Sequence, residues 1–243
     1  MPTTPQQNTY DQFADTYAQS YAQPSSGSDF IRDLVIPRLI ETAGRVDGLS
    51  VLDAGCGEGI VSRSLIGTAT HIMGIDIVPQ LIAYARQRDL SQSITYAVHD
   101  LSRPLPALTH TFDLVVSNLV LNDVPDYRGF ITTLSSVLKP HGRLVLSLNN
   151  PYSALLRQKV KNYFASESTA EYGFGPALYF HRTMEEYLHA FQDAGFLLRR
   201  LYDLQMTEAM VAHLPEKNRD FPWYSFYQRF PFILILDLIK CMG

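Results

Sequence analysis

The chain has 243 residues, of which 46% are hydrophobic, and a formal net charge of −4 at pH 7. This length is enough for a full hydrophobic core, and the mildly acidic balance argues against a nucleic-acid-binding protein. Two cysteines supply neither a disulfide framework nor a set of metal ligands, so we predict a cytoplasmic protein without a metal. The longest apolar run, Phe230–Ile239, is too short to span a membrane.

Two helices are predicted first along the chain. Aromatic residues recur in Tyr10–Tyr21 at spacings that place them on one helical face. The polar segment before it, Met1–Asn8, is not expected to be a signal peptide. In the amphipathic segment Phe30–Ala43, Pro37 is expected to kink the helix or to reset its start. The aromatic face of the first helix either packs on the rest of the domain or forms a lid over a ligand.

A glycine-rich loop follows the first predicted strand. Residues Val51–Gly59 read VLDAGCGEG and lead into a helix that starts at Ile60. The glycines let a ligand approach the backbone, and the helix N-terminus favours a carboxylate or a phosphate. Ile60 stands where the G-x-G-x-x-G loop of nucleotide-binding proteins has its last glycine. Asp53 can fix the loop or bind an ammonium, so a ligand with an amino group and a carboxylate, such as S-adenosylmethionine, fits better than a pyrophosphate.

Three further predicted strands end in polar side chains. They are Thr70–Ile77 with Asp76, Ile94–Asp100, and Phe112–Val116 followed by Ser117 and Asn118. Open α/β sheets bind ligands at these carboxyl ends. Asp76 can accept hydrogen bonds from ribose hydroxyls, and Asp100 can accept one from an adenine amino group while Leu101 packs on the ring. These features favour an adenosine ligand without choosing between S-adenosylmethionine and a nicotinamide cofactor.

Taken in order, these motifs resemble those of the class I S-adenosylmethionine-dependent methyltransferases. VLDAGCGEG resembles their first motif, GIDI the ribose-binding motif and HDL the adenine-binding motif. FDLVVSNLVLNDVPD resembles the strand-four motif, and LKPHGRLVLSL the step into strand five. The resemblance implies an α/β fold with a Rossmann-like, seven-stranded, mostly parallel sheet. It also implies an antiparallel C-terminal edge hairpin, helices on both faces, and helical or aromatic cap insertions.

The resemblance also implies S-adenosylmethionine as the cofactor and a single domain over residues 1–243. Residues 1–30 form a lid, 45–150 the cofactor-binding core, and 150–182 and 205–229 cap insertions. Cys56 is expected to fit the loop as a small side chain rather than to act as a nucleophile. Asn118 is expected to meet the methionyl group through its backbone carbonyl. The implied cofactor-binding residues are Tyr17, Tyr21, Asp53, Gly55, Cys56, Gly57, Asp76, Ile77, Asp100, Leu101 and Asn118.

A well-marked helix and two strands complete the predicted fold. Thr183–Ala194 starts at a threonine N-cap, and Glu186 completes a capping box. The strands are Phe196–Leu204 and Phe230–Ile239. Helices over Gln80–Arg88 and Asp126–Leu138 alternate with the earlier strands, which indicates a mainly parallel sheet.

Two segments rich in aromatic residues, 149–182 and 207–228, favour a small aromatic or apolar acceptor. The alternative is that these side chains fill the core of a small cap. His181 has the chemistry of a general base near neutral pH, or it packs and hydrogen-bonds locally. The other candidate substrate contacts are Asn122, Tyr152 and Tyr179.

The leading hypothesis is methyl transfer from S-adenosylmethionine to an oxygen, nitrogen or carbon of a small molecule, by a monomer or a homodimer. The segment NNPY at Asn149–Tyr152 resembles a motif of amino-group DNA methyltransferases. It follows strand five rather than strand four, so a nucleic-acid substrate is not expected. The alternatives are a non-catalytic methyltransferase-like partner protein that binds the cofactor and a nicotinamide-dependent oxidoreductase.

Overall fold

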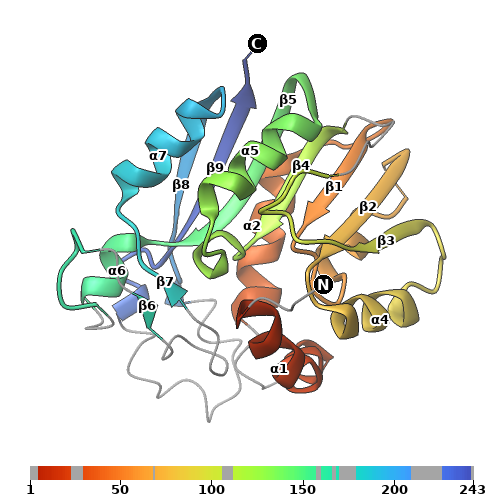
Figure 1. Ribbon diagram of the computed structural model, residues 1–243, viewed down its shortest axis with the longest axis horizontal. Coiled ribbons are helices and arrows are strands. Elements are labelled where there is room, and N and C mark those ends of the chain that lie inside the picture. The colour runs from red at the N-terminus through yellow and green to blue at the C-terminus, as the bar shows by residue number, and fades with distance from the viewer. Residues whose placement is uncertain are drawn as a thin grey trace.

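The computed structural model describes residues 5–22, 30–67, 69–105, 112–156, 160–165, 168–169, 179–208 and 226–241. Its centre is a seven-stranded sheet with the order β3-β2-β1-β4-β5-β9-β8 (Figure 1). Strands β1 to β5 pair in parallel, and β9 runs antiparallel between β5 and β8. This confirms the predicted Rossmann-like sheet with its antiparallel edge hairpin. The strands are β1 (Ser50–Ala54), β2 (His71–Asp76), β3 (Ile94–Val98), β4 (Phe112–Asn118), β5 (Leu138–Asn149), β8 (Phe196–Leu204) and β9 (Ile233–Lys240).

Helices cover both faces of the sheet, as predicted. Helices α2 (Ile36–Ala43), α3 (Ile60–Ser64) and α4 (Pro79–Arg88) contribute side chains to one core cluster. Helices α5 (Tyr127–Val137) and α7 (Met184–Asp193) contribute to the other. Successive strand residues point to opposite faces, so in β9 Ile233 and Ile235 join the first cluster while Leu234 and Leu236 join the second. The central strand β1 is buried along its whole length, because side chains cover the sheet on both faces there.

Helix α1 (Pro5–Ala22) lies by the carboxyl ends of the parallel strands (Figure 1). Its buried Ala14 packs with Val78 and Leu81 at the start of α4. On the other side, the Tyr10 hydroxyl donates a hydrogen bond of 2.5 Å to Asp123 in the short helix η2 (Leu121–Asp123). Helix α1 therefore bridges the segments that follow β2 and β4.

Several element boundaries differ from those predicted, and β3, for example, ends at Val98 instead of Asp100. Strand β4 includes Ser117 and Asn118 instead of ending at Val116. Strand β9 starts at Ile233 instead of Phe230, because the carbonyl groups of Pro231 and Phe232 accept hydrogen bonds from Asn150.

The predicted helix Phe30–Ala43 starts with a π-helical segment, η1 (Ile31–Val35). The Ile36 N–H donates five residues back, to Ile31. The regular helix α2 starts only at Ile36, next to Pro37, which has no N–H to continue the earlier bonding. Of the two effects expected of Pro37, the structure shows the reset start.

The cap segments are described only in part. Within 150–182 the structure contains α6 (Pro151–Leu156), β6 (Ser168–Thr169) and β7 (Tyr179–Phe180). Most of the second predicted insertion, residues 209–225, lies outside the described residues. In the described part of the chain, no helix is both long and apolar enough to cross a membrane.

The capping box of α7 is confirmed and gives a stability prediction. Thr183 Oγ1 accepts from the Glu186 N–H at 3.1 Å, and the Glu186 carboxylate accepts from the Thr183 N–H at 2.7 Å. We expect Thr183→Ala to lower the free energy of unfolding by about 1 kcal/mol, measured by chemical denaturation. The control is Thr132→Ala, at an exposed position inside α5, where no cap is lost. An equal effect in both variants would contradict the prediction.

Candidate functional site

The carboxylate of Asp76 fixes the glycine-rich loop to the end of β2. Its Oδ2 accepts from the Gly57 N–H at 2.8 Å, and its Oδ1 accepts from the Val78 N–H at 2.9 Å. Burial raises the pKa of this carboxyl, and these backbone donors oppose the shift. Each carboxylate oxygen has a second lone-pair direction, so both can still accept from a ribose hydroxyl. The predicted ribose contact is compatible with the geometry, whereas the tie to Gly57 was not predicted.

Asp53 presents one unpartnered oxygen at the end of β1. Its side chain is 1% exposed, and Oδ2 accepts from Ser62 Oγ at 2.5 Å. Oδ1 is buried and has no hydrogen-bond partner among the described residues. Burial raises the pKa of Asp53 to about 7, although the hydrogen bonds from Ser62 lower it. An ammonium group at Oδ1 would satisfy this oxygen and favour its ionised form, so the site fits the amino group of the cofactor.

Tyr17 of helix α1 lies against the glycine-rich loop. Gly55 and Gly57 have φ angles of 76° and 53°. A Cβ atom at Gly55 would overlap the methyl groups of Val120, and one at Gly57 would lie 3.4 Å from the ring of Tyr17. The close approach of Val120 to Gly55 and of Tyr17 to Gly57 therefore favours glycine at these two positions. Tyr17 lies near the loop, as the lid hypothesis expects, whereas the side chain of Tyr21 lies outside the described residues.

Cys56 is buried inside the loop. Burial raises the pKa of its thiol well above the usual value, and the nearby carboxylates of Asp53 and Asp76 raise it further. Because the thiolate is the nucleophilic form, this environment favours the expected packing role over a catalytic one.

The chain turns sharply at the end of β4. Leu119 has a φ angle of 57°, a strained conformation for a leucine. Its N–H donates to the carbonyl and to the hydroxyl of Ser147, at 3.1 and 3.0 Å. The Ser147 hydroxyl donates to Asn118 Oδ1 at 2.8 Å. Ser147, a residue that the sequence analysis missed, therefore fixes the backbone at which the methionyl group is expected.

The residues predicted to bind adenine are placed around the loops after β2 and β3. Asp100 Oδ1 accepts from the N–H and the hydroxyl of Ser102, at 3.0 and 2.6 Å. Leu101 is buried in the second core cluster, and Ile77 packs against the small cluster of Ala14, Val78 and Leu81. The adenine contacts themselves stay predictions.

His181 lies in an aromatic cluster. It is 1% exposed, and its Nε2 lies 2.9 Å from the Tyr163 carbonyl oxygen. The Tyr163 ring stacks on Tyr152 at a centroid distance of 4.7 Å, and Tyr179 is buried beside His181. The structure therefore brings three of the four predicted acceptor-side residues together.

The fourth, Asn122, lies in η2 and is fully buried. Its amide donates to the Tyr187 hydroxyl and accepts from the Asn149 N–H, at 3.1 and 2.9 Å. These two hydrogen bonds hold the Asn122 side chain within the fold, and the contact of Asn122 with a substrate stays a prediction. Its neighbour Asp123 does not cap α5, because Asp126 accepts the capping bond. Asp123 instead receives the Tyr10 hydrogen bond, and burial raises its pKa to about 7.

Comparison with known proteins identifies the family of the chain. A family model described as a methyltransferase domain matches residues 45–195. The ubiquinone biosynthesis O-methyltransferase of Xylella fastidiosa (strain M23) is 33% identical over 151 residues, which cover 59% of this chain and 60% of that protein. The match thus spans less than two thirds of the relative's length.

Two solved structures share the fold over most of their length. The S-adenosylmethionine dependent methyltransferase from Mesorhizobium loti has a TM-score of 0.69 at 23% identity, with 84% of this chain and 96% of that chain covered. The magnesium protoporphyrin IX methyltransferase from Synechocystis PCC 6803, solved with bound S-adenosylhomocysteine, has a TM-score of 0.64 at 19% identity, with 96% and 97% covered.

We expect Asp53 to give cofactor binding a pH dependence. An ammonium binds the ionised carboxylate, and protonation near pH 7 removes that charge. We therefore expect the affinity for S-adenosylhomocysteine to fall as the pH decreases from about 8 to about 6, by up to about tenfold per unit below the pKa. The affinity at each pH is measured by calorimetric titration.

The matched variant is Asp53→Asn, which cannot ionise. Its affinity is expected to be weaker than that of the wild type at the upper end of this range and to vary less with pH. This comparison separates Asp53 from Asp76 and Asp123, whose pKa values are also raised. A wild-type affinity that stays constant over the range would contradict the assignment.

Proposed function

The chain belongs to the class I S-adenosylmethionine-dependent methyltransferases, and from that premise we propose that it methylates a hydroxyl group of a small aromatic molecule. The observation that carries this proposal is the aromatic cluster around the buried His181, next to the loop that follows β4. The similarity to a protein named as an O-methyltransferase supports oxygen as the acceptor atom.

The cofactor side of the site provides binding and alignment. Bound S-adenosylmethionine supplies an electrophilic methyl group on a sulfonium, so orientation provides most of the acceleration. We assign Asp53 to the ammonium, Asp76 to the ribose and the backbone at Asn118 to the methionyl group. Helix α1, with Tyr17 against the loop, shields the cofactor from water.

Arg182 supports the placement of the acceptor beside the methyl group. Its guanidinium lies over the rings of Tyr127 and Phe180, at 4.3 and 5.3 Å. It donates hydrogen bonds of 2.6–3.1 Å to three carbonyl groups of the loop after β4, those of Leu121, Val124 and Pro125. The segment that carries His181 is therefore fixed against the carboxyl end of β4.

We assign the role of general base to Nδ1 of His181. A carbonyl oxygen can only accept, so Nε2 carries the hydrogen directed at Tyr163 and Nδ1 is left as the acceptor. Nδ1 is buried and has no hydrogen-bond partner in the described part of the chain. Proposed as the base, it takes the proton from the acceptor hydroxyl as the oxygen–methyl bond forms.

A panel of small acceptors tests the proposed function. Purified protein is incubated with S-adenosylmethionine and with phenols, catechols or amines of similar size, and the methylated product is identified by mass spectrometry. The proposal expects O-methylation of an aromatic hydroxyl compound. Turnover restricted to amines or to carbon acceptors would contradict the proposed acceptor atom.

The variant His181→Gln tests the base. We expect kcat to fall by about 10²–10⁴-fold, because proton removal loses its acceptor, while the affinity for S-adenosylhomocysteine stays unchanged. The control is His189→Gln, at an exposed position of α7, which is expected to be fully active. Full activity of His181→Gln would limit His181 to packing.

A further inference from the structure

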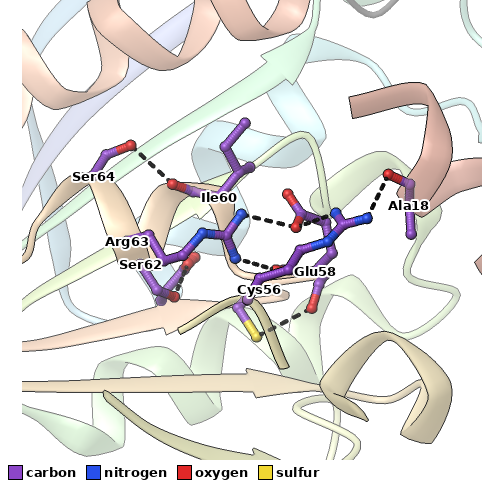
Figure 2. Close-up of polar contacts among 10 residues, drawn as sticks. Ala18, Cys56, Glu58, Ile60, Ser62, Arg63 and Ser64 are labelled. Carbon is purple, nitrogen blue, oxygen red and sulfur yellow. Dashed lines mark hydrogen bonds and ion pairs between the residues drawn. The ribbon is translucent and has the colours of Figure 1, made fainter. Parts of the chain in front are cut away.

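A buried charged cluster lies within the glycine-rich loop (Figure 2). Glu58, between Gly57 and Gly59, has a side chain that is 1% exposed. Its Oε2 accepts from Arg63 of α3 at 2.8 Å and from Arg88 of α4 at 2.5 Å. Burying a carboxylate costs several kcal/mol unless it is paired and hydrogen-bonded, so the two guanidinium groups hold Glu58 in this position.

The two arginines differ in what else they contact. Arg88 also donates from Nη2 to the carbonyl oxygen of Ala18 in α1, at 3.1 Å. Arg63 donates its other bond to the carbonyl of Glu58 itself, and among the described residues it makes no hydrogen bond or ion pair with α1. One guanidinium, that of Arg88, therefore joins the glycine-rich loop to the lid helix, between the Glu58 carboxylate and the Ala18 carbonyl that Figure 2 labels.

Among the described side chains of the lid helix, the fully buried ones are the small ones of Ala14 and Ala18. Tyr10, Phe13 and Tyr17 are partly buried. Burial of small side chains contributes little, so polar contacts decide whether α1 stays docked. In the described part of the chain such contacts include three hydrogen bonds: Tyr10 to Asp123, Tyr84 to Asp15 at 2.6 Å, and Arg88 to Ala18.

Of these three contacts, only that of Arg88 also reaches the cofactor loop. We propose that Arg88 is a positioning residue that couples docking of α1 to the conformation of the glycine-rich loop, and thereby sets the lifetime of the bound cofactor. The coupling is reciprocal: a loop ordered by the cofactor places Arg88 to bind Ala18, and a docked α1 holds Arg88 on Glu58. The inference rests on the cofactor site assigned above to this loop.

Hydrogen exchange of the α1 amides in the cofactor-free protein tests the docking step. Arg88→Gln is expected to speed this exchange by about tenfold, since it removes a hydrogen bond from a charged donor. Arg63→Gln is the matched control, because it removes one guanidinium from the same Glu58 oxygen and keeps the Ala18 contact. It is expected to leave α1 exchange at the wild-type rate.

Stopped-flow dissociation of S-adenosylhomocysteine tests the consequence for the cofactor. Dissociation from Arg88→Gln is expected to be about 5- to 20-fold faster than from the wild type, with a smaller change in Arg63→Gln. A second variant, Arg88→Lys, keeps a positive charge beside the buried Glu58, so the protein is expected to stay folded. Lysine cannot reach both the Glu58 carboxylate and the Ala18 carbonyl oxygen, so this variant is expected to release α1 as well.

Equal α1 exchange in Arg88→Gln and the wild type would overturn the proposal. Equal effects of Arg88→Gln and Arg63→Gln would overturn it too, because they would trace the change to Glu58 alone. Hydrogen exchange is measured on the cofactor-free protein and needs no turnover. Its result therefore does not depend on the outcome of the methylation assay.

Discussion

The buried carboxylate of Asp76 is the contact on which the ligand-binding edge of the sheet depends. It accepts the N–H groups of Gly57 and Val78, so the loop after β1 and the turn after β2 share one anchor. A buried charge needs such donors, and the donors lose their partner if the loop moves. With the loop fixed here, Asp53 and Tyr17 acquire defined positions at the same edge.

The electrostatics of this edge suit a cationic ligand. Burial raises the pKa values of Asp53, Asp76 and Asp123, which leaves carboxyl groups that gain from a nearby positive charge. Glu58 is different, because two arginines already pair with it. Asp53 and Asp76 are the carboxylates that we propose for an ammonium and a ribose, whereas Glu58 serves the internal order of the loop and its contact with α1.

The sequence was informative where the signals are local. The glycine-rich loop, the alternation of strands and helices and the Thr183 capping box follow from neighbouring residues, and the structure confirms them. Contacts between distant segments could not be predicted. A charged residue such as Glu58 in a loop is expected to be exposed, and nothing local pairs it with Arg88. Likewise, the sequence around Asn122 does not predict that its amide is hydrogen-bonded to Tyr187 inside the core.

The most direct test of the account is calorimetric binding of S-adenosylhomocysteine to the wild type and to Asp76→Asn, with NADH as the control ligand. The account predicts binding of the sulfur ligand and none of NADH. It also predicts that the amide variant loses about 1–3 kcal/mol of binding free energy, because an amide cannot accept through both of its polar atoms. Equal affinity of a folded variant, or binding of NADH in place of S-adenosylhomocysteine, would contradict it.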